Sequence, residues 1–461
     1  MRCKNLLWRA FDAGVFTVIA KGISGSPLEA VFQNRNEPSH PCVSTSESDC
    51  FHFDTLNLQG ERPLTYQRAG MLLVCFLVVL LDGLDTGAVS IVTPMLAKQW
   101  GVTPAVFTPV FVATNIGAVI GYTASGPLSA RFGQRIIGIS SVVLFGAGTL
   151  LSTLAGDVSS LAMIRLAAAI GLGGALPIAV TAATNVVSEK LKTSAAVLVT
   201  MGLSAGGVVG GLTGGPLMAE FGWQSIFIVG GLLPMVLMPL FAWVLLAPQK
   251  QCMQLSVDAA QSRALFINGL GAITGLLWLF AFLIFLVNYA LSSWIPTFLA
   301  DFGFSPIQAP LGAAAYGVGG LVGGFLVLSV IGKLGIRSVL MITSLVAIVS
   351  IATISHVTAG TSIILTLIGA IGAGLITGCI GQSALAVSLY PASLRTTGVG
   401  WAAACGRIGS IVGPAIGGAM LSLRWSARDI ILTAIPLIGV AILVLVMMSL
   451  VERKQQTLAS T

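Results

Sequence analysis

The chain has 461 residues, of which 56% are hydrophobic and only 8% are charged, and its formal net charge is +7. Its mean hydropathy is +0.96. Soluble domains carry about 25% charged residues, so this composition excludes an ordinary soluble protein. It indicates a chain that crosses the lipid bilayer many times.

Twelve apolar runs from Ala69 onward are each long enough to cross a bilayer as a helix. The sequence therefore predicts an all-α membrane protein with twelve transmembrane helices. We expect these helices at residues 69–96, 105–126, 136–156, 159–185, 194–218, 224–247, 267–298, 307–331, 338–357, 361–389, 398–421 and 429–450.

The positive charges of the short loops are distributed unevenly. Thirteen Lys and Arg residues fall on one side of the predicted membrane and three on the other. Because Lys and Arg accumulate in cytoplasmic loops, both termini are predicted to lie in the cytoplasm, with the chain in the inner (plasma) membrane. The net positive charge therefore reports topology and not nucleic-acid binding. The three residues of the sparse side are Lys98, Arg424 and Arg428.

The chain begins with a segment, residues 1–68, that mixes charges with Ser, Pro and Asn and has no apolar run long enough for a signal peptide. We predict a largely disordered cytoplasmic segment; alternatively the true start is Met71, just inside the first span. The rest is predicted to form an N-terminal six-helix bundle at 69–247, a short cytoplasmic linker at 248–266, a C-terminal six-helix bundle at 267–450 and a cytoplasmic tail at 451–461.

The two predicted bundles repeat one another at a constant offset of 202 residues. Prolines, tryptophans and basic loop residues match at this offset as well as the abundant glycines, so the matches exceed what glycine content alone would give. A single offset over six spans predicts a duplicated six-helix unit, the architecture in which major facilitator transporters bind substrate between the repeats. Examples are the pairs Pro94/Pro296, Arg131/Lys333, Gly133/Gly335, Arg135/Arg337 and Trp223/Trp425.

Two acidic residues, Asp82 and Asp85, lie inside the first predicted span. Each costs roughly 2.5–3.5 kcal/mol at the centre of a bilayer, and their spacing places both on one helix face. Their repeat positions hold Ile284 and Val287, so the charges are not duplicated with the framework. We predict a proton-coupling pair; the alternative places both acids near the water interface without a function.

Two arginines, Arg165 in the fourth span and Arg407 in the eleventh, are also absent from the equivalent repeat positions. Two acids and two bases can offset one another, so a neutral cluster between the halves is tolerable in the membrane. Protonation of an aspartate would then free an arginine, Arg407 by preference, to bind a substrate carboxylate.

Other polar groups at membrane depth are candidate substrate contacts. Gln382 offers a neutral donor and acceptor in the tenth span. Asn288, Tyr289 and Trp294 in the seventh span either meet a flat polar solute or form an interfacial belt of aromatic residues. The glycines of the fifth span are predicted to let helix backbones approach closely.

Two basic turns are candidate gating elements. The turn after the second span reads Gly126-Pro-Leu-Ser-Ala-Arg131-Phe-Gly133-Gln-Arg135, and a second turn between spans ten and eleven holds Arg395. We assign Arg131, Gly133, Arg135 and Arg395 to gating. For Arg395 a structural hydrogen-bonding role is at least as good an interpretation as a role in substrate binding.

The motifs together resemble those of a known family. These are Asp82-Gly-Leu-Asp85, the block Tyr390-Pro-Ala-Ser-Leu-Arg395-Thr-Thr-Gly-Val-Gly-Trp, and the sequence Gly-Arg407-Ile-Gly that follows. They are similar to the aromatic acid:proton symporters of the major facilitator superfamily, and the second block is similar, less closely, to neighbouring organic-anion and sugar branches.

The resemblance covers residues 66–452 and implies that the acid pair of the first span is required for proton-coupled uptake. It also implies that the family keeps arginine at Arg165, Arg395 and Arg407. Two positions depart from the family pattern. Ala130 stands where the turn after the second span usually has Asp, and Asn185 stands where span four commonly has Glu, although Glu189 one turn further on is a candidate replacement. These departures bear on gating more than on substrate binding.

The sequence therefore predicts a secondary transporter that imports an organic anion, most plausibly an aromatic carboxylate such as benzoate or a hydroxybenzoate, together with protons. The alternatives are a proton-driven exporter, a carrier of a non-aromatic acid, and a membrane sensor without transport. We expect a monomer in the lipid bilayer that binds no nucleic acid, and no enzyme activity, cofactor or metal site, because no catalytic or metal-binding spacing is present.

Overall fold

The computed structural model describes residues 66–188, 191–246, 265–266, 270–356, 360–391 and 394–460. Within these ranges, twelve helices are long and apolar enough to cross a membrane, which confirms the predicted fold class. Each overlaps one predicted span; the largest difference is at the end of the second, predicted at 126 and observed at Phe132. The proposed N-terminal segment up to residue 65, Glu189 and most of the predicted linker lie outside the described residues.

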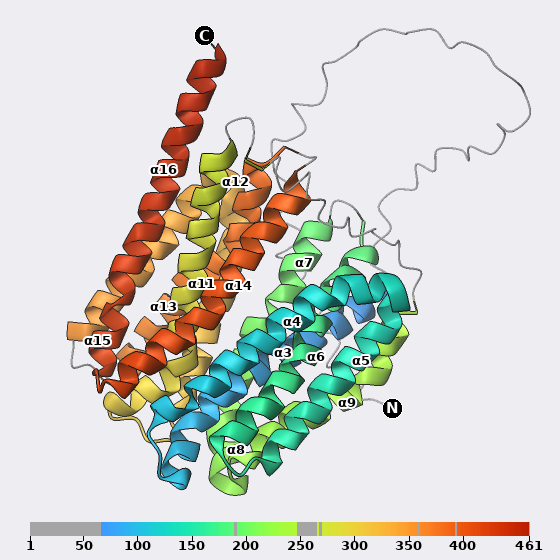
Figure 1. Cartoon of the computed structure of the whole chain (residues 1–461), viewed down its shortest axis with the longest axis vertical. Coiled ribbons are helices and arrows are strands. Elements are labelled where there is room, and N and C mark those ends of the chain that lie inside the picture. The colour runs from blue at the N-terminus through green and yellow to red at the C-terminus, as the bar shows by residue number, and fades with distance from the viewer. Residues whose placement is uncertain are drawn as a thin grey trace, which may run out of the picture. The chain divides into compact units, whose positions relative to one another are not determined.

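The helices fall into two groups that follow one another along the chain. Figure 1 shows the first group, coloured blue to green, beside the second group, coloured yellow to red. The first group comprises α3 (Tyr66–Trp100), η2 (Pro104–Phe107), α4 (Thr108–Phe132), α5 (Gln134–Leu151), η3 (Ser152–Leu154), α6 (Val158–Asn185), α7 (Lys192–Thr200), α8 (Gly202–Phe221) and α9 (Gln224–Val244).

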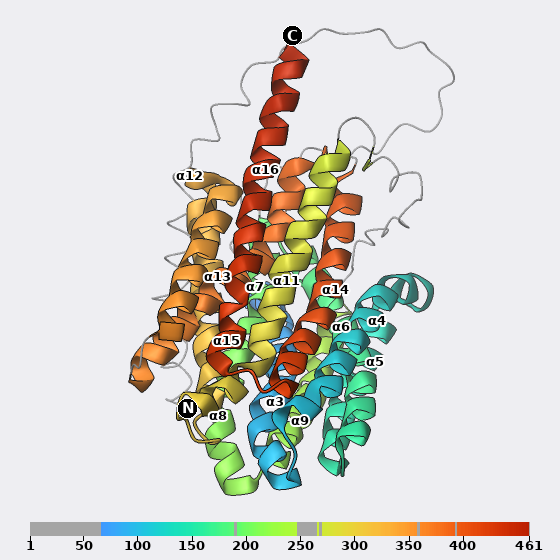
Figure 2. The same cartoon turned by 60° about the vertical axis from the view of Figure 1, so that its left-hand side comes forward.

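The second group contains the remaining spans, and two of them are joined in one long element. α12 holds the eighth and ninth spans, which meet at a kink where Gly335 leaves helical geometry. α16 continues past its membrane span and extends beyond the neighbouring helices (Figure 2). The elements are α11 (Leu270–Asp301), α12 (Pro310–His356), α13 (Thr361–Leu389), α14 (Arg395–Ser422), α15 (Ala427–Leu432) and α16 (Ala434–Ser460).

The backbone repeats itself at the offset found in the sequence. Within the described residues, positive φ angles occur at six positions, which form three pairs 202 residues apart. Such angles favour glycine because other residues clash there, and five of the six positions are glycine. The sixth is Arg424, with φ of 59°. The pairs are Gly101/Gly303, Gly133/Gly335 and Gly222/Arg424.

Glycines set the close helix packing in both halves. A Cβ at Gly117 of α4 would overlap the Leu166 carbonyl of α6. At the repeat position, a Cβ at Gly319 of α12 would overlap the Gly369 carbonyl of α13. Small residues allow such backbone contact between membrane helices. The same crossing is therefore built twice, once in each half.

Opposite ends of the helices differ in charge. We call the end that carries the turns at Arg131, Arg135, Lys333 and Arg337 the basic end, and the other the opposite end. At the opposite end, Asp157 caps the N-terminus of α6. Its side chain accepts a hydrogen bond from the backbone N–H of Ser160, and this contact holds the pKa of the Asp157 carboxyl below its usual value. The turn between α5 and α6 is thereby fixed.

The two halves contact each other through α8 with α12 and through α4 with α14. Near the opposite end, a Cβ at Gly418 of α14 would overlap the side chain of Thr108, the first residue of α4. A Cβ at Gly211 of α8 would overlap the backbone of Ala314 in α12. These contacts bring the first-half helices α3 and α4 close to α11 and α14, where the candidate site lies.

Candidate functional site between the two halves

The two aspartates of α3 have different partners. The carboxylate of Asp85 receives two hydrogen bonds from Arg165 of α6, at 2.9 Å from Nη1 and 2.7 Å from Nη2. The Thr149 hydroxyl of α5 donates a further hydrogen bond to the same carboxylate at 2.8 Å. Both charged side chains are fully buried, with 0% of each exposed. Asp85 therefore takes part in a closed cluster within the first half of the chain.

Arg165 is held from several sides. Its guanidinium carbon lies 5.9 Å from the centre of the Phe227 ring of α9, and Nη2 also contacts the backbone carbonyl of Asp85 at 3.3 Å. Its Nε is buried without a hydrogen-bond partner. The cluster therefore connects α3, α5, α6 and α9, and the predicted role of Arg165 in substrate binding stays a prediction.

Asp82, nearly one turn earlier on α3, faces the second half. It is 4% exposed, and its carboxylate accepts a hydrogen bond from the Thr86 hydroxyl at 3.3 Å. The charge of Asp82 interacts with Arg407 of α14 as well as with Asp85. Thr86 itself is exposed. Asp82 is thus the acid through which the first half meets the arginine of the second.

Arg407 is surrounded by aromatic side chains and remains partly exposed. Its guanidinium carbon lies 5.2 Å from the centre of the Tyr122 ring of α4. Tyr289 of α11 lies near the same guanidinium. In the part of the chain that the structure describes, no carboxylate forms a direct ion pair with Arg407. Its N–H donors are therefore available for an anion.

Further polar groups lie on the membrane-spanning helices α11, α12 and α13 of the second half. The Tyr316 hydroxyl of α12 donates a 2.7 Å hydrogen bond to Oδ1 of Asn288. Cys379 of α13 lies near Arg407, Tyr289 and Tyr316. Gln382, one turn further along α13, is 2% exposed and donates to the Ser383 hydroxyl at 2.9 Å.

Gln382 also presents an acceptor, because its Oε1 atom is buried without a hydrogen-bond partner. A buried polar atom left unpaired costs free energy. An unpaired carbonyl at membrane depth is therefore a candidate acceptor for a hydroxyl of a solute. The predicted role of Gln382 in substrate binding stays a prediction.

Trp294 has a different environment from the other predicted contacts. It is fully buried, and its indole N–H donates to the backbone carbonyl of Pro414 at 3.1 Å. The centre of its ring lies 4.7 Å from that of Phe111 of α4. These contacts use its one donor and favour a packing role between the halves, so substrate contact by Trp294 is left as an untested prediction.

The predicted gating residues lie at the basic end. Arg131, Gly133 and Arg135 are exposed in the turn between α4 and α5. Arg395, at the start of α14, donates from Nε to the backbone carbonyl of Tyr390 at 3.1 Å, which is the structural hydrogen bond considered for it. In the second half, Arg337 forms an ion pair with Glu452 of α16. Their part in gating remains a prediction.

The two positions that depart from the family pattern are also at the basic end. Ala130 is exposed, and the side-chain nitrogen of Asn185 is buried without a hydrogen-bond partner. Neither position supplies the negative charge that an acid would. The replacement considered, Glu189, is outside the described residues.

Sequence reasoning missed three residues of the site. Two of them, Tyr122 and Tyr316, were not predicted from the sequence. The chain contains only five tyrosines, and three of these, Tyr122, Tyr289 and Tyr316, belong to the candidate site. A scarce aromatic residue with a polar tip inside an apolar span was the available signal. The third, Thr149, had no signal, because threonine commonly bonds its own helix backbone.

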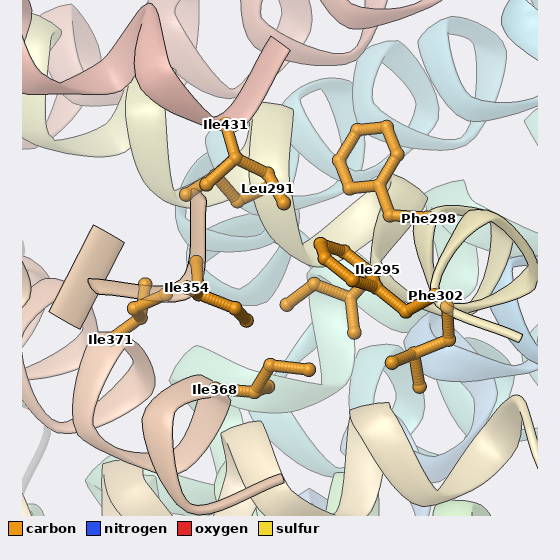
Figure 3. Close-up of a pocket in the computed structure, with 9 residues that line it drawn as sticks. Leu291, Ile295, Phe298, Phe302, Ile354, Ile368, Ile371 and Ile431 are labelled. Carbon is orange, nitrogen blue, oxygen red and sulfur yellow. The ribbon is translucent and has the colours of Figure 1, made fainter. Parts of the chain in front are cut away.

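A separate hollow in the second half contains no polar side chain. Figure 3 shows it between α11, α12, α13 and α15, with isoleucine, leucine and phenylalanine side chains pointing into it. Such a lining offers no partner to a carboxylate, since a buried charge requires pairing. The charged cluster between the halves is therefore the candidate site for an anion. The lining residues include Leu291, Phe298, Ile354, Ile368 and Ile431.

Twelve membrane-length helices in the described part of the chain, with backbone angles that repeat at a fixed offset, fit the architecture of membrane transporters built from repeated units. The family model "Major Facilitator Superfamily" matches residues 75–414 and 277–460. The chain belongs to that superfamily, and it is a multi-pass membrane transporter and not an enzyme.

Relatives of known description match along most of their length. The chain is 31% identical over 434 residues to the 4-hydroxybenzoate transporter PcaK of Pseudomonas aeruginosa, covering 87% of this chain and 95% of the relative. It is 33% identical to the 3-(3-hydroxy-phenyl)propionate transporter of Escherichia coli, covering 83% and 94%. It is 29% identical to a gallate transporter of Pseudomonas putida, covering 79% and 88%.

Solved structures share the fold. A bacterial homologue of the human lysosomal transporter Spinster, described as inward-facing and occupied, superposes with a TM-score of 0.65 at 18% identity, covering 85% of this chain and 98% of that one. A single-residue mutant of the nucleoside transporter NupG gives a TM-score of 0.65 at 14% identity, covering 82% and 99%. At these identities the likeness concerns the fold alone.

Proposed function

We propose that this protein imports a small aromatic carboxylate together with protons. The observation that carries the proposal is the environment of Arg407. Its guanidinium is partly exposed, has no ion-pair partner among the described residues, contacts the Tyr122 ring and lies near Tyr289. A guanidinium fork binds a carboxylate through two parallel hydrogen bonds. The flanking rings suit an aromatic solute.

The relatives support this substrate class. Their names specify 4-hydroxybenzoate, hydroxyphenylpropionate and gallate. All three are carboxylates with a hydroxylated ring. In this chain the carboxylate is assigned to Arg407 of α14, and a ring hydroxyl is assigned to the unpaired Gln382 acceptor or to the Asn288–Tyr316 pair.

The proton is assigned to Asp82 and not to Asp85. Asp85 is bound by Arg165 and Thr149, so protonation there would leave Arg165 as an unpaired buried charge, which is strongly unfavourable. Asp82 has only the longer Thr86 hydrogen bond and faces Arg407. Its protonation removes a negative charge from the vicinity of Arg407, which then favours a substrate anion. An inward proton gradient would in this way drive import.

The orientation in the membrane follows from the charge of the loops. We propose that the basic end faces the cytoplasm, with both termini on that side, because positively charged loops remain cytoplasmic. The site is formed by helices of a single chain, so a monomer suffices for transport.

Uptake by purified protein in liposomes tests the function. With labelled 4-hydroxybenzoate outside, accumulation should occur when the outside is more acidic and should stop when a protonophore collapses the gradient. Accumulation that persists undiminished after the protonophore contradicts proton coupling. Accumulation that occurs only when the inside of the liposomes is more acidic than the outside would identify a proton-driven exporter. Transport of acetate but not of 4-hydroxybenzoate would contradict the aromatic substrate class.

A further inference from the structure

One aromatic ring of the first half lies directly on the charged group of the second half. The Tyr122 ring of α4 is 5.2 Å from the guanidinium carbon of Arg407 of α14. A planar guanidinium can stack its face on an aromatic ring while its edge keeps its hydrogen-bond donors. The contact with Tyr122 therefore leaves the fork of Arg407 available for a carboxylate.

The orientation of Tyr122 follows from the residue before it. A Cβ at Gly121 would overlap the carbonyl oxygen of Ile170, so that side of α4 is pressed against α6. The next residue is rotated by about 100° around the helix, which turns Tyr122 away from α6 and toward α14. Gly121 therefore faces α6, whereas Tyr122 contacts Arg407 of α14.

Tyr122 keeps a large free surface although it contacts Arg407, since 38% of it is exposed. The Arg407 guanidinium beside this ring also lies near Asp82 and Tyr289. The exposed Thr86 lies one turn after Asp82 on α3. Tyr122 therefore keeps accessible ring surface in addition to its contact with Arg407.

A second aromatic wall comes from the other half. Phe285 and Tyr289 of α11 have ring centres 6.2 Å apart and planes inclined by 16°. A Cβ at Gly406 would lie 3.0 Å from the Phe285 ring, so this ring rests on α14 immediately beside Arg407. The Tyr122 ring of the first half and the Phe285–Tyr289 pair of the second half therefore both lie near residues 406 and 407 of α14.

We propose that Tyr122 is the residue that makes this site select a carboxylate attached to an aromatic ring over an equally charged acid without one. The carboxylate binds the fork of Arg407, and its ring lies between Tyr122 of the first half and the Phe285–Tyr289 pair of the second half. A flat ring is stabilised against aromatic walls beyond simple burial. This inference rests on the proposed function and deepens it.

The test compares two acids of equal charge and similar size, benzoate and cyclohexanecarboxylate. Affinities are measured on the purified full chain in nanodiscs for the parent and for Tyr122→Phe, Tyr122→Leu and Tyr122→Gln. Aromatic pairs contribute about 0.5–1.5 kcal/mol, or roughly 2- to 13-fold in affinity. We expect the variants without a ring to lose roughly this factor for benzoate and to bind cyclohexanecarboxylate within about twofold of the parent, while Tyr122→Phe keeps the parent ratio.

A matched control is Phe325→Leu, which also replaces a ring by leucine. Phe325 of α12 is 47% exposed and contributes no group to the site, so both affinities should stay at the parent values. Two ringless variants of different polarity keep the test valid if one of them folds poorly.

The outcomes separate this inference from the proposed function. If Tyr122→Leu and Tyr122→Gln both keep the parent ratio of the affinities for benzoate and cyclohexanecarboxylate, the role of Tyr122 is overturned. It is also overturned if Tyr122→Phe loses as much affinity for benzoate as Tyr122→Leu does. An equal loss for both acids also overturns it, because Tyr122 would then act only by orienting Arg407. If the parent protein binds no aromatic carboxylate, the proposed function itself fails, and this inference fails with it.

Discussion

Asp85 and Arg165 form a two-pronged ion pair that is fully enclosed by the first half of the protein. The distances are 2.9 and 2.7 Å, and neither side chain has any exposed surface. Asp82, three residues earlier on the same helix, instead interacts with Arg407 across the interface of the halves. Two acids that look equivalent in the sequence therefore have separate environments. We expect substitution of Asp85 to lower stability and substitution of Asp82 to impair proton coupling.

The Asp85–Arg165 pair should matter first for stability. Removing one partner of a buried ion pair leaves an uncompensated charge and costs about 3–5 kcal/mol. We expect Asp85→Asn and Arg165→Gln each to lower the midpoint of thermal unfolding of the purified protein strongly. Asp82→Asn is the matched control and should unfold close to the parent, since Asp82 has only one weak hydrogen bond.

The double variant Asp85→Asn/Arg165→Gln sharpens this prediction. It buries no charge, so its loss of stability should be smaller than the sum of the two single losses, as expected for residues in direct contact. Additive losses, or single variants that unfold like the parent, would show that the pair contributes little to folding.

The second prediction concerns proton coupling. Asp82→Asn keeps the shape of the side chain but cannot exchange a proton. We expect uptake driven by a pH gradient to fall to background, while exchange of labelled for unlabelled substrate at equal pH on both sides continues. A variant that still accumulates substrate against its gradient in response to acid outside would remove Asp82 as the proton site.

The membrane spans were the most predictable part of the molecule. Apolar runs of sufficient length determine a helix in a bilayer because the backbone must satisfy its own hydrogen bonds there. The twelve observed helices accordingly overlap the twelve predicted ones. The offset of 202 residues was also visible, and it extends to backbone angles such as those of Gly133 and Gly335.

The partners of the charged residues were not predictable in the same way. The spacing of Asp82 and Asp85 indicates a shared helix face but not which helix lies against each carboxylate. That choice depends on how α5 and α6 pack on α3, which brings Thr149 and Arg165 to Asp85. The contact of Tyr122 with Arg407 joins helices of different halves and has no local signature in the sequence.

The third prediction uses the repeat. Arg424 has a φ of 59°, where its counterpart Gly222 has 76°. Left-handed backbone costs a residue with a side chain roughly 1–2 kcal/mol relative to glycine. Arg424→Gly should therefore raise the unfolding midpoint modestly, and Gly222→Ala, the matched change in the other half, should lower it. A lowered midpoint for Arg424→Gly would mean that contacts of the arginine side chain outweigh the strain.

The last prediction concerns Arg407 as the anchor of the anion. Arg407→Lys retains the positive charge but lacks the planar fork that binds both oxygens of a carboxylate. We expect the affinity for 4-hydroxybenzoate to fall substantially in the Lys variant and binding to be nearly lost in Arg407→Ala. Removing the arginine also deprives Asp82 of its opposing charge, which favours the protonated form of that acid. The pH dependence of any remaining binding should therefore be weaker.

A packing role for Arg407 leads to a different result. Both variants would then lose expression or thermal stability together, and whatever protein folds would bind with the parent affinity. Binding measured on purified protein at two pH values, alongside the unfolding midpoint, separates the two cases. Because Arg407 is partly exposed and has no ion-pair partner among the described residues, its loss should cost far less stability than the loss of Arg165. A folded Arg407→Ala protein with parent-like affinity and pH response would exclude this arginine as the anion anchor.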